Sequence, residues 1–163
     1  MKKVLLIASA VLVFFGCSKS GSDPEPVHCD GLVTDTAGTG DNGRVYMPTA
    51  FTPNSDGLND NIRPFVANIA SFTFTLYDQN NAVIFTSNTA GQGYSSAQPA
   101  AGSFVKYYYK VQATTLAGKK IGVCGDIYKL NNCRPASPVL YFEDQLTPNG
   151  FTGVTAEVLP TCP

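Results

Sequence analysis

The stretch FVKYYYKVQATT, residues 104–115, decides the fold class. Its odd positions carry an apolar set and its even positions are mostly polar. The apolar set is Val105, Tyr107, Tyr109, Val111 and Ala113. Because successive side chains of a β-strand point to opposite faces, this alternation predicts a long strand with one face in a core. By the same reasoning, Tyr108 is expected on the opposite, solvent-facing side.

Neighbouring runs have the same period and are predicted to pair with this strand. Residues 72–77 alternate, and after a turn residues 82–86 return, which is typical of a β-hairpin. Residues 120–130 are predicted to pair back against the long strand after a second turn. The alternation is lost around Gly122–Asp126, and this loss predicts a β-bulge.

The rest of the chain also favours extended structure. Residues 44–50 are predicted as the first strand, and residues 139–142 and 154–159 as further short strands. Fifteen glycines and eleven prolines indicate short strands broken by turns. We therefore predict an all-β fold, a small Ig-like β-sandwich over residues 44–130, followed by a C-terminal extension over residues 131–163.

Residues 47–60, MPTAFTPNSDGLND, are predicted to form a tight loop rich in side-chain oxygen. Pro48 and Pro53 favour extended backbone before them, and Asp56-Gly57 is a strong turn pair. One interpretation is a turn held by side-chain bonds to backbone amides, without a ligand. The other is a structural Ca²⁺ site, and no other cofactor is expected at this loop. Its candidate ligands are Asn54, Asp56, Asn59 and Asp60.

The same stretch resembles the opening motif of the gliding-motility-associated C-terminal domain, the type B sorting module of type IX secretion in Bacteroidetes. The matching residues are Pro48, Ala50, Phe51, Thr52, Pro53, Asn54, Asp56, Gly57, Asn59 and Asp60. The resemblance implies an Ig-like sandwich that secretion machinery reads. This chain departs from the family in having no Trp and in continuing beyond the module through residues 131–163.

The N-terminus is typical of an exported lipoprotein. Lys2 and Lys3 precede a short apolar run, so residues 1–16 are predicted to be a signal peptide. Gly16-Cys17 resembles a lipobox, which predicts lipid attachment at Cys17, although ordinary signal cleavage is the alternative. Residues 17–43 are predicted to be a lipidated tether and lead-in. The expected location is the outer membrane, facing the periplasm or the cell surface.

Four further cysteines are candidates for disulfides: Cys29, Cys124, Cys133 and Cys162. An even number in an exported protein indicates two bridges, with three possible connectivities. The short spacing favours a local Cys124–Cys133 bridge, which would leave Cys29 to pair with Cys162. A metal site is the weaker alternative, because the sequence has no Cys-x-x-Cys spacing and a single histidine, His28.

Composition and motifs reduce the number of function classes that fit this chain. A net charge of −1 gives no basic face for nucleic acid. No Ser-His-Asp set or phosphate-binding glycine loop occurs, so we expect no catalytic residues and no enzyme activity. The predicted function is a cell-envelope lipoprotein that acts as a binding or structural module, with the membrane and other envelope proteins as partners. The alternatives are a type IX sorted surface protein that meets the secretion machinery, and an extracellular protein that binds Ca²⁺ or glycan through residues 54–60 and Tyr94 or Tyr108.

Overall fold

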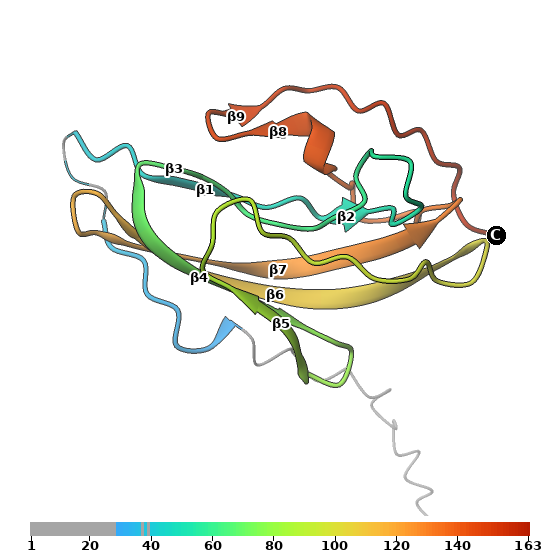
Figure 1. Cartoon of the computed structure of the whole chain (residues 1–163), viewed down its shortest axis with the longest axis horizontal. Coiled ribbons are helices and arrows are strands. Elements are labelled where there is room, and N and C mark those ends of the chain that lie inside the picture. Colours follow the sequence, from blue (N-terminus) through green and yellow to red (C-terminus); the bar gives the residue numbers. More distant parts are fainter. Residues whose placement is uncertain (1–28, 37, 39) are drawn as a thin grey trace, which may run out of the picture.

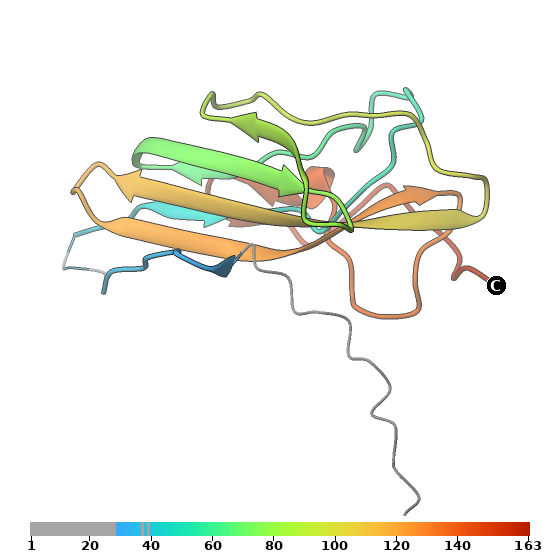
Figure 2. The same cartoon turned by 90° about the horizontal axis from the view of Figure 1, so that it is seen from below.

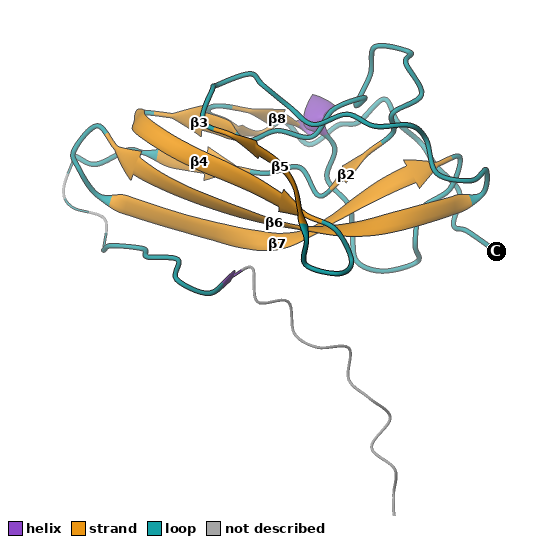
Figure 3. Ribbon diagram, turned by 60° about the horizontal axis from the view of Figure 1, so that its bottom comes forward, coloured by secondary structure: helices purple, strands orange, loops and turns teal. Residues whose placement is uncertain are grey.

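The structure, a computed structural model, describes residues 29–36, 38 and 40–163. It confirms an all-β sandwich: a five-stranded sheet faces a two-stranded ribbon, and a small hairpin lies beyond the ribbon (Figure 1). The elements are β1 (Arg44–Tyr46), β2 (Ala50–Phe51), β3 (Phe65–Ala67), β4 (Ile69–Tyr77), β5 (Val83–Ser87), β6 (Ser103–Thr115), β7 (Lys120–Asn131), the 3₁₀ turn η2 (Glu143–Gln145), β8 (Leu146–Thr147) and β9 (Gly150–Phe151). Strands and loops account for nearly all of the described chain (Figure 3).

The large sheet has the order β2-β7-β6-β4-β5. β6 and β7 form its longest pairing, antiparallel from Ser103↔Asn131 to Thr114↔Lys120. β4 pairs antiparallel with β5, and β6 with β7, which confirms the two predicted hairpins. β4 also pairs antiparallel with β6 and so joins the two hairpins into one sheet. β2 is parallel to β7, so the motif at residues 47–60 begins on the edge of the sheet.

The core lies on one face of the large sheet, as the alternation predicts. Tyr107, Tyr109, Val111 and Ala113 of β6 are all buried there. They meet Phe72, Phe74 and Leu76 of β4 and are closed over by Phe51 and Ile62. Burying a Phe or Leu side chain contributes about 1.5–3 kcal/mol, so this cluster is the main source of stability.

The predicted bulge near Gly122–Asp126 is wrong, because β6 and β7 keep one register throughout. Two close contacts explain the lost alternation. A Cβ at Gly122 would lie 2.8 Å from the Cβ of Leu32 on the outer face. A Cβ at Gly125 would lie 3.1 Å from the ring of Tyr109 on the core face. Both positions carry glycine because another side chain packs directly over the backbone: Leu32 over Gly122, and the Tyr109 ring over Gly125.

Three predicted strands are also wrong. Residues 44–50 divide into β1 and β2, which belong to different sheets, and the break falls at Met47-Pro48-Thr49. Residues 139–142 lie beside β2 without forming a ladder: the Thr49 and Ala50 amides both donate to the Tyr141 carbonyl, at 2.8 and 3.1 Å. Residues 154–159 also form no strand, and the extension instead forms the β8–β9 hairpin.

All four candidate cysteines form disulfides, but the favoured pairing is wrong. The bridges are Cys29–Cys124 and Cys133–Cys162, with Cα atoms 5.5 and 4.9 Å apart. The chain from Cys124 to Asn131 is extended, because both residues belong to β7. Extended backbone rises about 3.3 Å per residue, so that stretch alone spans roughly 23 Å. Cys124 and Cys133 therefore lie too far apart to bridge.

The described part of the lead-in is irregular, as predicted, and is held to the outer face of the sheet. The Val33 amide donates to the Gln112 Oε1 at 2.9 Å, and the Gln112 Nε2 returns a bond to the Val33 carbonyl at 3.0 Å. Cys29 is bridged to Cys124 on this same face. Figure 2 shows the lead-in (blue) and the segment after β7 (orange) on one side of the sheet.

Candidate functional site

The extension forms a groove on the outer face of the large sheet. Its two walls are residues 134–142 and residues 155–159, and they enclose about 330 Å³. We call this feature the tail groove. Its apolar lining comes from Ala136, Val139, Leu140, Phe142, Val158 and Leu159, and its polar lining from Arg134, Thr155 and Glu157.

The floor of the tail groove belongs to a second apolar cluster. Leu140 and Phe142 are buried against Ala50, Tyr128 and Leu130, which belong to β2 and β7. The side chains of Tyr128 and Leu130 point away from the main core, because they share a face with even-numbered residues of β6. The large sheet is therefore covered on both faces at this end, and the groove rests on the sheet.

The end of the groove next to Arg134 is closed by a disulfide and by backbone hydrogen bonds. The Cys133–Cys162 disulfide joins the two walls. Next to it, the Arg134 amide donates to the Pro160 carbonyl and the Cys162 amide donates to the Arg134 carbonyl, both at 2.9 Å. These bonds set the spacing of the walls.

The end of the groove next to Glu157 is held by polar side chains, two of which belong to the motif at residues 47–60. The Asn59 side chain, only 5% exposed, accepts from the Asp144 amide at 3.0 Å and donates to the Glu157 Oε2 at 3.1 Å. The Thr52 hydroxyl donates to the same Glu157 oxygen at 2.9 Å. We call Thr52, Asn59, Asp144 and Glu157 the motif clamp. It joins positions about a hundred residues apart in sequence.

The clamp uses a strained backbone position. Asn59 has a φ of 54°. This left-handed region is costly for most side chains and is tolerated best by Gly, Asn and Asp. An asparagine at this position therefore supplies both the tolerated backbone conformation and the amide that bonds the extension.

Replacing Asn59 with alanine should lower the free energy of unfolding by about 2–3 kcal/mol, because the Asp144 amide loses its acceptor and a half-buried Glu157 loses a donor. Urea unfolding monitored by fluorescence measures this loss. The matched control is Asn54→Ala, because Asn54 is exposed and, among the described residues, its side chain bonds only to Asp56 of its own loop. Equal losses in the two variants would show that Asn59 has no special role in holding the extension.

The predicted Ca²⁺ ligands do not all converge. Asn54, Asp56 and Asp60 lie in one loop, whereas Asn59 turns away into the motif clamp. The Asp60 oxygens accept from the Ser55 and Gly57 amides at 2.6 and 2.8 Å, so the loop is held by side-chain-to-backbone bonds. Among residues 29–36, 38 and 40–163, no three His, Cys, Asp or Glu side chains are grouped to hold a metal ion. Ca²⁺ binding at this loop stays a prediction.

The two tyrosines proposed for glycan stacking, Tyr94 and Tyr108, are both half-buried. Tyr94 packs into the core, with its ring 5.7 Å from Phe85 and 6.2 Å from Tyr107. Tyr108 lies half-buried on the outer face, where the Lys106 ammonium sits 5.0 Å from its ring centre.

An aromatic hollow elsewhere on the surface was not predicted. Tyr46, Met47, Tyr141, Leu146 and Phe151 line about 320 Å³, and we call it the aromatic groove. The rings of Tyr141 and Phe151 are perpendicular and 5.2 Å apart. Its residues come from two distant stretches, 46–47 and 141–151, and no local sequence pattern links them.

Charge on the outer face centres on one ion pair. The Lys106 Nζ lies 2.9 Å from the Asp126 Oδ2. Burial lowers the pKa of Lys106, but the hydrogen bond and the charge of Asp126 outweigh it, so the pKa is raised. Burial raises the pKa of Tyr109 to about 12, with the Asp126 charge adding to it. Lys106 therefore stays charged and Tyr109 stays neutral at pH 7.

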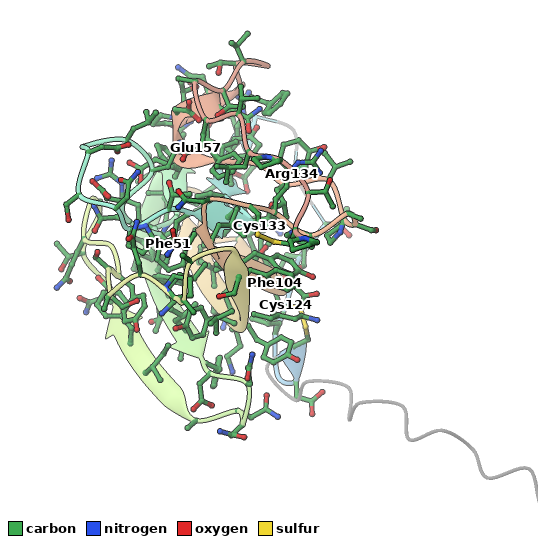
Figure 4. The ribbon with its side chains drawn as sticks, turned by 90° about the vertical axis from the view of Figure 1, so that its right-hand side faces the viewer. Phe51, Phe104, Cys124, Cys133, Arg134 and Glu157 are labelled. Carbon is green, nitrogen blue, oxygen red and sulfur yellow. A yellow bond between two sulfur atoms is a disulfide. The ribbon has the colours of Figure 1, made fainter. Side chains whose placement is uncertain are left out.

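The tail groove carries one charge of each sign. Figure 4 places Arg134 next to Cys133 and Glu157 apart from it, toward the motif loop. Neither residue belongs to a motif, so sequence reasoning missed both. Their position depends on a disulfide and on the motif clamp, which join segments distant in the chain.

No protein-family model, curated protein or solved structure matches this chain. Cys17 and the predicted signal peptide lie outside the described residues. Within the described part of the chain, no helix has the length and apolar character needed to cross a bilayer.

Proposed function

We propose that this protein is a cell-envelope lipoprotein that binds a ligand in the tail groove without catalysing a reaction. The observation that carries the binding proposal is the groove itself. A hollow of about 330 Å³ falls within the range of about 300–1,000 Å³ that is usual for small-molecule sites. Its mostly apolar lining with a few charged and polar groups is also usual for such sites.

Two features support export and anchoring. Disulfides persist in oxidising compartments, and this domain has two of them. The lipobox-like Gly16-Cys17 follows a charged and then apolar leader, which favours acylation of Cys17. The proposed location is the outer membrane, with the sandwich held clear of the bilayer by the tether.

Metabolic labelling with a palmitate analogue tests the anchor. The wild type should be labelled and recovered with membranes, whereas Cys17→Ser should lose the label and appear in the soluble fraction. Equal labelling of both proteins would remove the anchor from the proposal.

An apolar fluorophore such as anilinonaphthalene sulfonate tests the groove. Val139 lines the groove and is 74% exposed, so Val139→Asp should leave the fold intact and weaken fluorophore binding at least about threefold by placing a charge in the apolar wall. Val83→Asp is the control, because Val83 is 58% exposed on β5, outside the groove. Equal effects of the two changes would contradict binding at the tail groove.

Sorting by type IX secretion is a second proposal, supported by the match at residues 48–60. Removing the secretion pore should then abolish protease accessibility of the protein on intact cells. Unchanged accessibility would argue against it.

Glycan binding is a third proposal, and the aromatic groove supports it better than Tyr94 or Tyr108. Three aromatic rings at the surface suit the apolar face of a sugar ring, and the tyrosine hydroxyls can bond its hydroxyl groups. Tyr141→Ala should abolish retention on a glycan array, while Tyr108→Ala should not. Retention by the Tyr141→Ala protein would exclude this groove.

A further inference from the structure

We infer that the tail groove takes a short apolar peptide with free termini, an unmodified dipeptide being the simplest case. The Arg134 guanidinium receives its carboxylate and the Glu157 carboxylate receives its ammonium group. This inference rests on the proposed function, because it names the ligand class of the same groove.

The first argument is the state of Arg134. This side chain is half-buried and lines the groove. Its one hydrogen bond within the described chain is a long one, from Nη1 to the Pro135 carbonyl at 3.4 Å, and no described carboxylate pairs with it. A guanidinium has five donors arranged to hold a carboxylate through two parallel bonds. Arg134 therefore offers unused donors to an anionic group in a partly desolvated place.

The second argument is the position of Glu157. Its Oε2 accepts from Thr52 and Asn59, at 2.9 and 3.1 Å, and its backbone amide donates to the Thr155 hydroxyl at 2.9 Å. These three bonds hold the side chain in place. Its second oxygen, Oε1, has no hydrogen bond from any described residue, so it remains an acceptor for a cation in the groove.

Charge complementarity then selects the ligand. The groove presents one cation and one anion, on different walls, with the apolar side chains of Leu140, Phe142 and Leu159 also lining it. A fatty acid satisfies Arg134 but gives Glu157 no partner, and an amine does the reverse. An apolar peptide with free termini satisfies both charges and places side chains on the apolar floor. The volume of about 330 Å³ favours a ligand of a few residues over a long chain.

Calorimetric titration of the mature full chain with Leu-Leu tests the inference. The free dipeptide should bind saturably. N-acetyl-Leu-Leu, which lacks the ammonium group, and Leu-Leu-amide, which lacks the carboxylate, should each bind at least about tenfold more weakly, because each loses one charge-assisted pair. This comparison uses only the wild type, so it does not depend on any variant folding.

Two variants assign the charges. Arg134→Gln should weaken binding of Leu-Leu about tenfold and leave Leu-Leu-amide unchanged. Glu157→Gln keeps a carbonyl for Thr52 and Asn59 to bond, so it should leave the motif clamp intact; it should weaken Leu-Leu about tenfold and leave N-acetyl-Leu-Leu unchanged. Lys110→Gln is the control and should change neither affinity, because Lys110 lies opposite Cys124 on the same face of the sheet but outside the groove lining.

Three outcomes would overturn the inference. One is the absence of saturable binding by Leu-Leu. Another is equal binding by the free and capped dipeptides. The third is binding of a medium-chain fatty acid that depends on Arg134 and not on Glu157, which would identify an anionic amphiphile as the occupant. In each case, fluorophore binding that still depends on Val139 would leave the proposed function standing.

Discussion

Replacing Phe51 with alanine should lower the free energy of unfolding by about 3–5 kcal/mol, the usual cost of deleting a fully buried aromatic side chain. Phe51 is 0% exposed and belongs to the motif at residues 47–60. Its ring centre lies 6.4 Å from Tyr94 and 6.5 Å from Tyr107, so it joins the motif to β6 and to the long loop after β5. The alanine variant leaves a cavity between three segments that are distant in the chain.

Phe104→Ala is the matched control for this prediction. Phe104 lies on the other face of β6, apart from Phe51 (Figure 4). It is 40% exposed, and its ring centre is 5.8 Å from that of Tyr128. Because much of this ring already meets water, its removal should cost about 1 kcal/mol or less. Urea midpoints with unchanged slopes give both values. Similar losses would mean that Phe51 is not the centre of the core.

Replacing both Cys133 and Cys162 with serine should abolish the tail groove while the sandwich stays folded. This bridge closes a segment of 29 residues, and loop-closure entropy predicts a stability loss of about 3–4 kcal/mol. The expected functional result is at least a tenfold loss of fluorophore affinity, because the two walls are no longer joined beside Arg134. Circular dichroism should still report β-structure.

The control for this variant is the pair of changes Cys29→Ser and Cys124→Ser. That bridge closes 95 residues, so its loss should destabilise the chain by about 4–5 kcal/mol. It ties down the lead-in and lies outside the groove lining, so fluorophore affinity should be unchanged. If both double variants lost affinity equally, general destabilisation would explain the result and the groove would not.

The motif stretch at residues 47–60 has two roles. Its predicted turn at Asn54–Gly57 forms, with Asp56 and Asp60 bonded to nearby backbone amides. Its flanking residues do something that no local pattern indicates: Phe51 enters the main core, and Thr52 and Asn59 hold the extension through Glu157. These bonds hold Glu157, which lines the tail groove.

The sequence by itself determined the local β-structure. The period of two in residues 72–77 and 104–115 predicted β4 and β6 and the buried face of β6, because a strand's side-chain directions follow from its backbone geometry alone. The even number of cysteines in a predicted exported chain indicated two bridges, and both form.

The tertiary structure alone decided which distant segments meet. It paired Cys29 with Cys124 and Cys133 with Cys162, divided residues 44–50 between two sheets, and brought Arg134 and Glu157 to one groove. Such contacts depend on how the sheet and its loops pack in three dimensions, and side-chain periodicity carries no information about a partner about a hundred residues away. The candidate site is made of these long-range contacts, so it could not be found from the sequence.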